Sequence, residues 1–389
     1  MKTQRSCCIE IRFAVGKINI AIEEGVVTKC DTKITSIYYN AEQYIQTHSL
    51  LENISFISRL SVHESINVTL AFVQAIEQML SIQVPKRSQY VRTILCEGER
   101  IISHLLTLGN IAFSIGVHPL YAQILHIHKH YELLCEKIFQ RSNFVDFFVL
   151  GGSKCNIATE LVSLWIKFFE QISSVVPIVE SILVNNNIFK HRTSHLGIIT
   201  SNEAIGYCLS GPVARASGVV FDVRDMDNCV EDSLSTLTNS SYEIYGDFSP
   251  ILKSDGNVYA RVLVYIEEIQ QSINIMKQCL NKLHVMEDYE YKSLFIDATD
   301  RCIFFDLASI DFDAIDKGLY PTRRLYNAVE CPNGEFGIYL AGDGKSRLQR
   351  CKINNYYFHL LQALEQIILG QNEEDVFLII SSLGLLTIV

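Results

Sequence analysis

The sequence predicts an α+β protein, in which a multi-helix bundle follows a small antiparallel sheet and precedes a β-hairpin. Three patterns indicate this class. Apolar residues alternate with period two across residues 9–29, recur at helical spacing between Leu51 and Ser142, and resume a strand pattern over 335–353. We therefore divide the chain into an N-terminal β region, residues 1–50, and a helical bundle, residues 51–389.

Composition narrows the class of protein further. With 389 residues, 48% of them hydrophobic, the chain can bury a large core. Its 33 Lys and Arg residues are outnumbered by 43 Asp and Glu, and no basic stripe is present, which argues against nucleic acid as a partner. A mean hydropathy of +0.17 indicates apolar surface that partner subunits would cover.

The 12 cysteines include no C-x-x-C pair, which argues against zinc ribbons, iron–sulfur ligation and a disulfide framework. We expect mostly buried, reduced thiols. The start of the chain has neither a secretory stretch nor an Arg-rich presequence. The apolar end, 376–389, is shorter than the roughly 20 residues that a spanning helix needs, and we expect no transmembrane span.

The elements follow in order. Alternating residues 9–13 and 18–22, separated by Gly16-Lys17, predict paired strands. Helices are predicted over 62–81, 88–108 and 120–141. Gly109 is placed as the C-terminal stop of the second of these helices. A long helix over 158–184 should be kinked or divided by Pro177.

The second half is less regular. Thr200 or Ser201 caps a short helix ending near Gly211, and residues 212–257 form an irregular excursion. An amphipathic helix over 259–283 is followed by irregular residues 284–329, and a last helix begins near Tyr357. The hairpin over 335–353 is expected to turn at residues 342–344.

Glu97, Arg100 and His104 lie at i, i+3 and i+7, so they share one face of a predicted helix. We interpret this face as an ionic network that ties the helix to its neighbours, with contact to a cofactor as the alternative. A second charged segment, 208–224, combines glycines with Arg215, Asp222 and Arg224, whose charges could pair or hold an anion.

Other patterns predict no site. His126, His128 and His130 alternate on a predicted helix, where only the first and last share a face, and we interpret them as a solvated face rather than metal ligands. Gly151-Gly152 lacks the third glycine of a dinucleotide loop, and no nucleophile elbow is present.

Several segments together carry a family resemblance. They are residues 84–92, then Glu97, Arg100 and His104, then Gly211-Pro212 with Arg215, Ser217, Gly218, Asp222 and Arg224, then Glu330, 334–339, Asp343-Gly344 and 350–353. In this order they resemble the D-type core subunit of respiratory complex I, the NADH:quinone oxidoreductase, which is related to the large subunit of nickel-iron hydrogenases. The resemblance runs from about Lys29 to about Ile380.

The resemblance implies a core subunit that is not active alone and binds no cofactor by itself. Together with a partner subunit that holds the terminal iron–sulfur cluster, it would form the cavity where electrons from NADH reach quinone, coupled to proton translocation. Other peripheral-arm and membrane-arm subunits would be further partners. A hydrogenase activity is disfavoured, because the two cysteine pairs that hold nickel and iron are missing.

The resemblance also implies site residues. Phe56, Arg59, Ser114 and Phe144 would line the quinone cavity, and a network facing the subunit partner and its cluster would comprise Arg87, Arg92, Glu97, Arg100, His104, Arg215, Asp222 and Arg224. The hydrogen-bond and proton donors that are usual in the family are replaced in this chain. No histidine occurs in residues 9–16, and Phe56 stands where the family has a tyrosine. Ser114 replaces an aspartate, Tyr39 an arginine and Phe144 a histidine. His63 is a candidate replacement proton donor, and a locally solvated histidine is the alternative.

Two functional hypotheses remain beside the hydrogenase-like one. The chain is a divergent complex I core subunit, or it is a scaffold of the same complex that no longer contributes quinone chemistry. The absent presequence and the drift of the pocket suit an organelle-encoded protein on the matrix side of the mitochondrial inner membrane.

Overall fold

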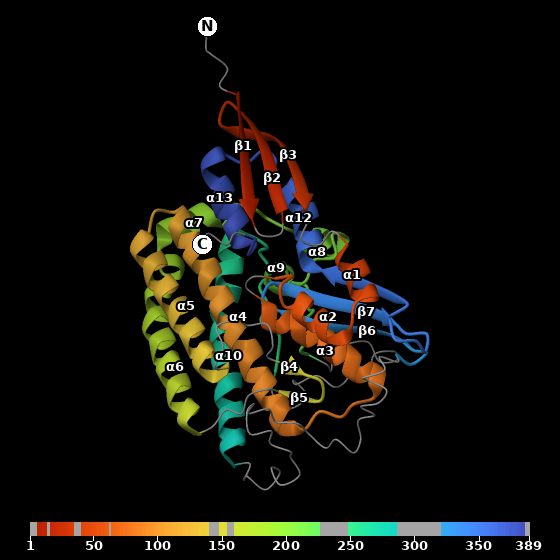
Figure 1. The fold of residues 1–389 in the computed structure, drawn as a ribbon. Coiled ribbons are helices and arrows are strands. Elements are labelled where there is room, and N and C mark those ends of the chain that lie inside the picture. The colour runs from red at the N-terminus through yellow and green to blue at the C-terminus, as the bar shows by residue number, and fades with distance from the viewer. Residues whose placement is uncertain are drawn as a thin grey trace.

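A computed structural model describes residues 6–13, 16–34, 40–61, 64–139, 148–153, 159–225, 248–285 and 320–385. Figure 1 shows three parts: the N-terminal sheet at one end, a bundle of long helices on one side, and a second sheet with short helices on the other. The predicted α+β class, with a helical centre between two sheets, is confirmed.

The N-terminal sheet has three antiparallel strands in the order β1 (Ser6–Phe13), β2 (Gly16–Glu23) and β3 (Val26–Ile34). Every second side chain of β2 is buried, as the alternation predicted. Residues 1–50 also include a helix, α1 (Ala41–Thr47), which follows the strands.

The middle of the chain is helical, as its apolar spacing predicted. It contains α2 (Leu50–Ile57), α3 (Ser65–Leu80), α4 (Lys86–Ser114) and α5 (His118–Phe139). The predicted stop at Gly109 is wrong, because α4 continues to Ser114. A Cβ at Gly109 would lie 3.3 Å from side-chain atoms of Ile124 and Tyr121, so this glycine allows α4 and α5 to pack closely.

The predicted helix over 158–184 is divided, as expected. It consists of α6 (Thr159–Val179), with Pro177 inside its last turn, and a π-helical segment, η3 (Glu180–Val184), before α7 (Asn187–Thr193). No single described helix combines the length and apolarity needed to cross a bilayer. Residues 164–184 and 187–193 meet those criteria only as a pair bent by 63°.

The boundaries around residue 211 differ from the prediction. Thr200 caps α8 (Ser201–Gly206) as expected, with Glu203 completing a capping box, but the helix ends five residues before Gly211. Gly211 instead begins α9 (Gly211–Ala216), which occupies the start of the predicted irregular excursion. Proline at the second position of α9 suits a helix start, a signal that the glycine-rich composition obscured.

The last third contains α10 (Val258–Val285) and a three-stranded antiparallel sheet. The sheet has the order β6 (Arg324–Cys331), β7 (Gly334–Ala341) and β8 (Arg350–Asn355). The predicted hairpin is therefore β7–β8, and β6 is a strand where an irregular segment was expected. The helices α12 (Tyr356–Ile367) and α13 (Glu373–Ser382) follow, and a two-stranded ribbon pairs β4 (Phe148–Val149) with β5 (Gly152–Ser153).

Two long helices, α4 and α10, form the central contact of the bundle and run side by side in Figure 1. The helix α3 packs against β6 and β7, and α13 packs against α4. The described cysteines are free thiols: Cys7, Cys8 and Cys208 are exposed, and the other six are buried. Charged side chains of α4 point into this packed centre, where the candidate site lies.

Candidate functional site

Arg215 is the centre of a buried ionic network. From the short helix α9 its Nε donates to Glu268 Oε1 on α10 at 2.8 Å, and its Nη1 donates to Glu330 Oε1 on β6 at 2.7 Å. Asp222 Oδ2 lies 3.2 Å from the same Nη1. None of these side chains reaches solvent, so one guanidinium joins a helix, a strand and a loop inside the protein.

A second part of the network surrounds Glu97 on α4. Arg100 Nε lies 3.3 Å from Glu97 Oε2, and Arg224 Nη1 lies 3.4 Å from Glu97 Oε1. Ser272 on α10 donates to Glu97 at 2.5 Å. Arg224 also binds both oxygens of Asp222, at 3.0 and 2.8 Å, which links this part to Arg215.

Arg100 extends the network to the C-terminal sheet. Its Nη2 donates to the carbonyl of Glu330 at 2.5 Å, and its Nη1 donates to the carbonyl of Cys331 at 3.2 Å. The backbone of β6 is therefore fixed by α4, while the Glu330 side chain is fixed by Arg215.

His104 closes the network on α4. Its Nε2 lies 2.8 Å from Glu268 Oε2, its ring contacts Tyr265 edge-on at 5.0 Å, and its Nδ1 is buried without a hydrogen-bond partner in the described chain. Burial lowers the pKa of His104, although Glu268 opposes this. The neutral imidazole therefore donates its Nε2–H to Glu268.

The network contains four carboxylates, from Glu97, Asp222, Glu268 and Glu330, and three guanidiniums, from Arg100, Arg215 and Arg224. With His104 neutral, one negative charge is left over. Burial would raise the pKa of Glu268, but Arg215 and the His104 hydrogen bond lower it overall, whereas burial and the nearby Asp222 raise the pKa of Glu330. Among Asp222, Glu268 and Glu330, Glu330 is thus the carboxylate that most readily takes up a proton.

Two predicted network residues lie elsewhere. Arg92 on α4 forms a buried bidentate pair with Glu77 on α3, at 2.9 and 2.6 Å, and also donates to the carbonyl of Gly152 in β5. Arg87, in the first turn of α4, donates to the carbonyl of Leu283 at 3.3 Å. Both arginines connect elements of the fold outside the cluster around Arg215.

One further buried arginine was not predicted. Arg261 on α10 donates to three neutral acceptors, Ser382 Oγ at 3.0 Å and the carbonyls of Gly256 and Gly197 at 2.9 Å each. Burial without a carboxylate partner lowers its pKa to about 10. Arg261 thereby joins α10 to α13 and to the segment before α8.

Two buried carboxylates at the start of α3 were also not predicted. Glu64, at the N-cap position, accepts from the backbone and side-chain amides of Asn333 at 3.1 and 2.9 Å and from the Tyr356 hydroxyl. Glu99 accepts from the backbone amides of Ile66 and Asn67, each at 2.9 Å. Burial raises the pKa of Glu64 to about 7 and that of Glu99 to about 8.

Of the predicted cavity wall, Phe56, Arg59 and Ser114 are described. Phe56 on α2 is half-buried and stacks on Tyr44 at 4.2 Å, and Arg59 is exposed just beyond that helix. Ser114, at the end of α4, donates to the carbonyl of Asn110 at 2.6 Å and lies 3.3 Å from Ser381 Oγ. His63, Phe144 and Tyr39 lie outside the described residues.

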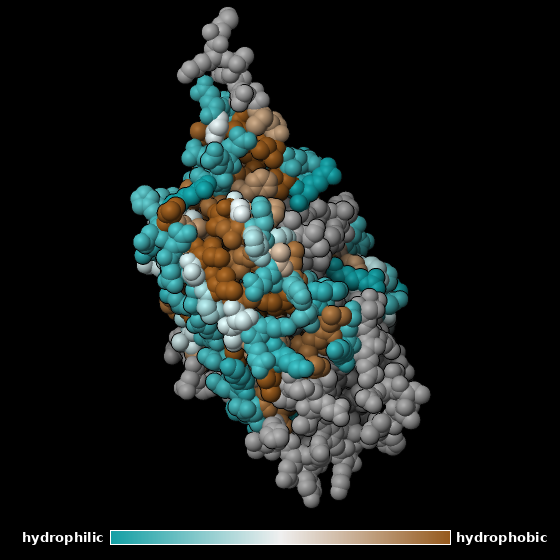
Figure 2. Space-filling view, turned by 90° about the vertical axis from the view of Figure 1, so that its left-hand side faces the viewer, coloured by the Kyte–Doolittle hydropathy of each residue, from teal (hydrophilic) through white to brown (hydrophobic). Residues whose placement is uncertain are grey.

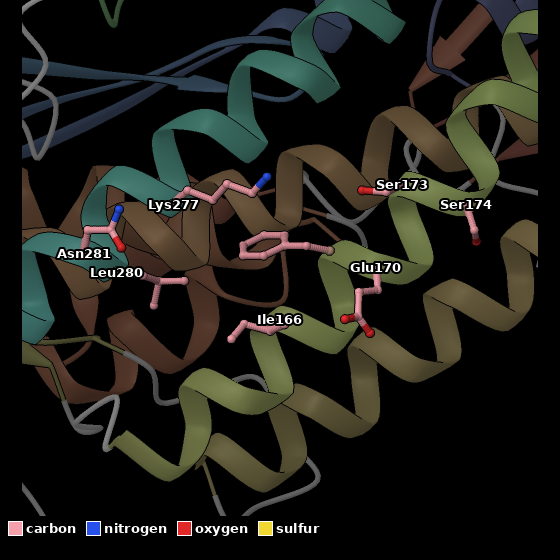
Figure 3. Close-up of a pocket in the computed structure, with 8 residues that line it drawn as sticks. Ile166, Glu170, Ser173, Ser174, Lys277, Leu280 and Asn281 are labelled. Atoms are coloured by element: carbon pink, nitrogen blue, oxygen red, sulfur yellow. The ribbon is translucent and has the colours of Figure 1, made fainter.

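Two hollows on the described surface are large enough to describe. The larger, of about 650 Å³, lies between α6 and α10, where Lys277 extends over the ring of Phe169 at 5.9 Å (Figure 3). The smaller, of about 200 Å³, lies beside Asn40 and Ile353. Phe56, Arg59 and Ser114 line neither of these two hollows.

In the described residues no three His, Cys, Asp or Glu side chains are placed to hold a metal ion. The rings of His126 and His130 meet edge-on at 4.3 Å, and His130 Nδ1 lies 2.6 Å from the Gln171 amide. His128 lies 3.9 Å from Glu132. These contacts agree with a polar helix face.

Several partners of the network were missed for one reason. Glu268 and Ser272 are one turn apart on an amphipathic helix, where Glu268 follows the half-buried Glu267 and resembles part of a solvated face. Glu64 and Glu99 have no Lys or Arg three or four residues away along the chain, the spacing at which helical side chains pair. Only the helical phase of Glu268 relative to the buried apolar residues of α10 could have indicated that it points inward.

Comparisons with known proteins identify relatives. Residues 128–387 match the family described as respiratory-chain NADH dehydrogenase, 49 Kd subunit. The D-type subunit of NADH-quinone oxidoreductase from Wolbachia sp. subsp. Brugia malayi (strain TRS) is 28% identical over 378 residues, which cover 95% of this chain and 93% of the relative. The D-type subunit from Pelagibacter ubique (strain HTCC1062) is 29% identical over 381 residues, which cover 95% and 92%.

Proposed function

The chain belongs to the 49 kDa subunit family of respiratory-chain NADH dehydrogenase, and we propose that it forms one wall of the cavity in which quinone is reduced. The enzyme is a multisubunit NADH-quinone oxidoreductase, and the chain acts as one of its subunits. The observation that supports a cavity-wall role is the buried network around Arg215. It fixes α4, α9, α10 and β6 against one another, so side chains on their ends keep constant positions.

Electrons would come from the iron–sulfur cluster of a neighbouring subunit. The described residues offer no metal-binding group, and the described cysteines show none of the paired spacing that a cluster needs. The chain would therefore contribute shape, charge and protons to the reaction.

Three described residues would face quinone from this side. Phe56 offers an apolar ring held by Tyr44, Arg59 offers an exposed cation, and Ser114 offers a hydroxyl at the end of α4. The flat, conjugated ring of a quinone can stack on the first, and its carbonyl oxygens suit the other two. Phe144, outside the described residues, would complete the proposed wall, and His63 would be a candidate proton donor.

A photoreactive quinone analogue tests this proposal in the assembled complex. We expect labelled peptides from residues 50–61 and from the end of α4, with excess quinone preventing the labelling. Ser114→Trp should abolish labelling, whereas Ile205→Trp, at an exposed position on α8, should not. If labelling persists in the presence of excess quinone and also in the Ser114→Trp variant, the proposed wall is refuted.

A scaffold without quinone chemistry is the second candidate. It is favoured by one observation: the Ser114 hydroxyl already donates within α4, and Phe56 has no hydroxyl to donate. A density map of the complex separates the two functions. Side chains that fill the space between Phe56 and the neighbouring subunit would support the scaffold, and an open cavity would support quinone binding.

The partner subunits would cover the apolar surface of the chain. Figure 2 shows apolar side chains gathered on one face, below the N-terminal sheet. Such a face is costly to leave in water. Cross-linking of the complex, followed by mass spectrometry, should place residues of this face against other subunits.

We also propose coupling to proton translocation, on the matrix side of the mitochondrial inner membrane. Vesicles containing the complex should acidify or alkalise their interior when NADH and quinone are supplied, and an uncoupler should abolish the change. Immunodetection of the chain in fractionated cells tests the location. Detection only in a compartment other than mitochondria would refute it.

A further inference from the structure

The buried carboxyl of Glu64 differs from the four carboxylates of the network around Arg215. It is fully buried, and within the described chain no ion pair joins it to a cation. Its hydrogen-bond donors are the Asn333 backbone amide, the Asn333 side-chain amide and the Tyr356 hydroxyl, all of them neutral. Glu268, by contrast, contacts Arg215 directly.

A carboxyl group in this environment holds a proton more strongly than in water, because burial disfavours the charged form. The pKa of Glu64 is accordingly raised to about 7 by burial, against the effects of Tyr356, Asn333 and the charge of Arg100. The group can therefore gain or lose a proton near neutral pH. The hydrogen bond from Tyr356 favours the ionised form, so it limits the rise.

The charged and titratable groups around Glu64 come from several elements. Arg100 and Glu99 belong to α4, Cys331 to β6, Tyr356 to α12 and Tyr265 to α10. Arg100 is the cation among them, and its guanidinium is engaged by Glu97 and by two carbonyls of β6. A change of charge on Glu64 therefore acts directly on the network.

The position of Glu64 relates it to the proposed quinone wall. It lies five residues after Arg59 and begins α3, while Tyr356 begins α12 directly after β8. Asn333 lies in the tight turn between β6 and β7, three residues after Glu330. The Glu64 carboxyl thus joins the proposed wall segment to the sheet that carries the ionic network.

We propose that Glu64 and Tyr356 form a buried proton-holding pair that supplies one of the two protons taken up when quinone is reduced. This inference rests on the proposed function. Quinone takes two electrons from the neighbouring subunit's cluster, the O–H bond of Glu64 breaks, and a quinone oxygen gains that proton. Glu64 remains as a carboxylate, held by the Tyr356 hydroxyl, until water supplies a new proton.

The Glu64–Tyr356 pair would supply a proton donor that the proposed quinone wall lacks. Phe56 and Ser114 offer no acid, whereas quinone reduction needs protons. Glu64 is the acid and Tyr356 is a positioning residue, since its hydroxyl acts through the carboxylate.

The test uses the assembled complex carrying Glu64→Gln or Tyr356→Phe. Glutamine keeps the shape, and its oxygen can still accept from Asn333 while its amide nitrogen donates to the Tyr356 oxygen. It cannot release a proton, so quinone reduction at pH 6 to 7 should fall by about 100-fold. The decline of the wild-type rate above pH 7 should also disappear. Tyr356→Phe should keep that decline but move its midpoint to higher pH, because the ionised carboxylate loses a donor.

Two controls isolate the effect. Electron transfer from NADH to a water-soluble acceptor that bypasses quinone should be unchanged in every variant. Glu99→Gln removes a neighbouring buried acid that binds only the start of α3, and it should leave the pH profile as in the wild type. A wild-type profile in Glu64→Gln, or an unshifted midpoint in Tyr356→Phe, would overturn the proposal.

An infrared titration gives an independent measurement that needs no turnover. A protonated-carboxyl stretch should titrate with a midpoint near pH 7 in the wild-type complex and be missing from Glu64→Gln. Its presence in Glu64→Gln would refute the assignment. A wild-type complex that shows this titration but does not reduce quinone would refute the proposed function, and with it the proton delivery, while leaving the proton-holding site itself in place.

Discussion

Arg215 on α9 and Glu268 on α10 meet at 2.8 Å in the interior, where neither side chain reaches solvent. Breaking such a pair is costly, because the remaining charge stays buried and unpaired. We expect Arg215→Met to destabilise the fold by about 3–5 kcal/mol. The measurement is the melting temperature and the yield of the assembled complex.

The double variant Arg215→Met with Glu268→Met should recover part of this loss, since it removes a charge on both sides. Glu330 and Asp222 still lose their partner, so recovery should be incomplete. A double variant that is less stable than the sum of both single changes would contradict the pairing.

Glu99 should make stability depend on pH. Its folded-state pKa of about 8 lies above the ordinary value of 4.5, so the folded chain holds a proton that the unfolded chain releases. This contribution is fully present below pH 4.5 and is lost as pH rises through about 8. The melting temperature should therefore fall over this range, and Glu99→Gln should flatten the fall. Equal slopes for the two proteins would show that Glu99 does not hold the proton.

Gly211 should tolerate no side chain. It has φ +70°, and a Cβ there would lie 2.6 Å from the Asn333 carbonyl oxygen and from Gly334 Cα. Gly211→Ala should therefore push α9 away from the β6–β7 turn and lengthen the contact between Arg215 and Glu330, at a cost of about 1–3 kcal/mol. Gly206→Ala is the matched control, because a Cβ there meets nothing within 4 Å. Similar melting temperatures for both variants would contradict this account.

Lysine should not be able to replace Arg261 without loosening the contacts that Arg261 makes. Its guanidinium donates in three directions at once, to Ser382 and to the carbonyls of Gly256 and Gly197. A lysine ammonium is a point charge on a flexible stem and cannot reproduce this planar arrangement. We expect Arg261→Lys to increase hydrogen exchange in α13, whereas α5 keeps its protection. Unchanged exchange in α13 would show that the three bonds do not hold that helix.

The helices could be predicted from the sequence because their apolar spacing is long and regular. Residues 259–283 gave almost the full extent of α10, and Pro177 correctly marked the end of the α6 region. Glycines were ambiguous, since the same residue type stops a helix, allows close packing or starts a turn. Gly109 and Gly211 were misassigned for this reason, and only their neighbours in space decide which role applies.

The site was predicted in part. Glu97, Arg100, His104, Arg215, Asp222 and Arg224 meet in one network, but they were grouped by family resemblance and by helical spacing. The partners that complete the network, Glu268 above all, come from distant segments whose sequence resembles solvated surface. Glu64 was missed because its neutral partners, Asn333 and Tyr356, follow it by more than 260 residues. Such long-range pairing leaves no local pattern.

The network around Arg215 also constrains how the chain can mature. Its charges come from residues 97–104, 215–224, 268 and 330, so a ribosome must synthesise most of the protein before they can neutralise one another. Until Glu330 emerges, Arg215 lacks one of its three carboxylate partners and Arg100 lacks the β6 carbonyls that it binds, so the network is incomplete and α4 cannot be buried without cost. We therefore expect a nascent chain that stays open and dependent on chaperones until its C-terminal sheet has formed.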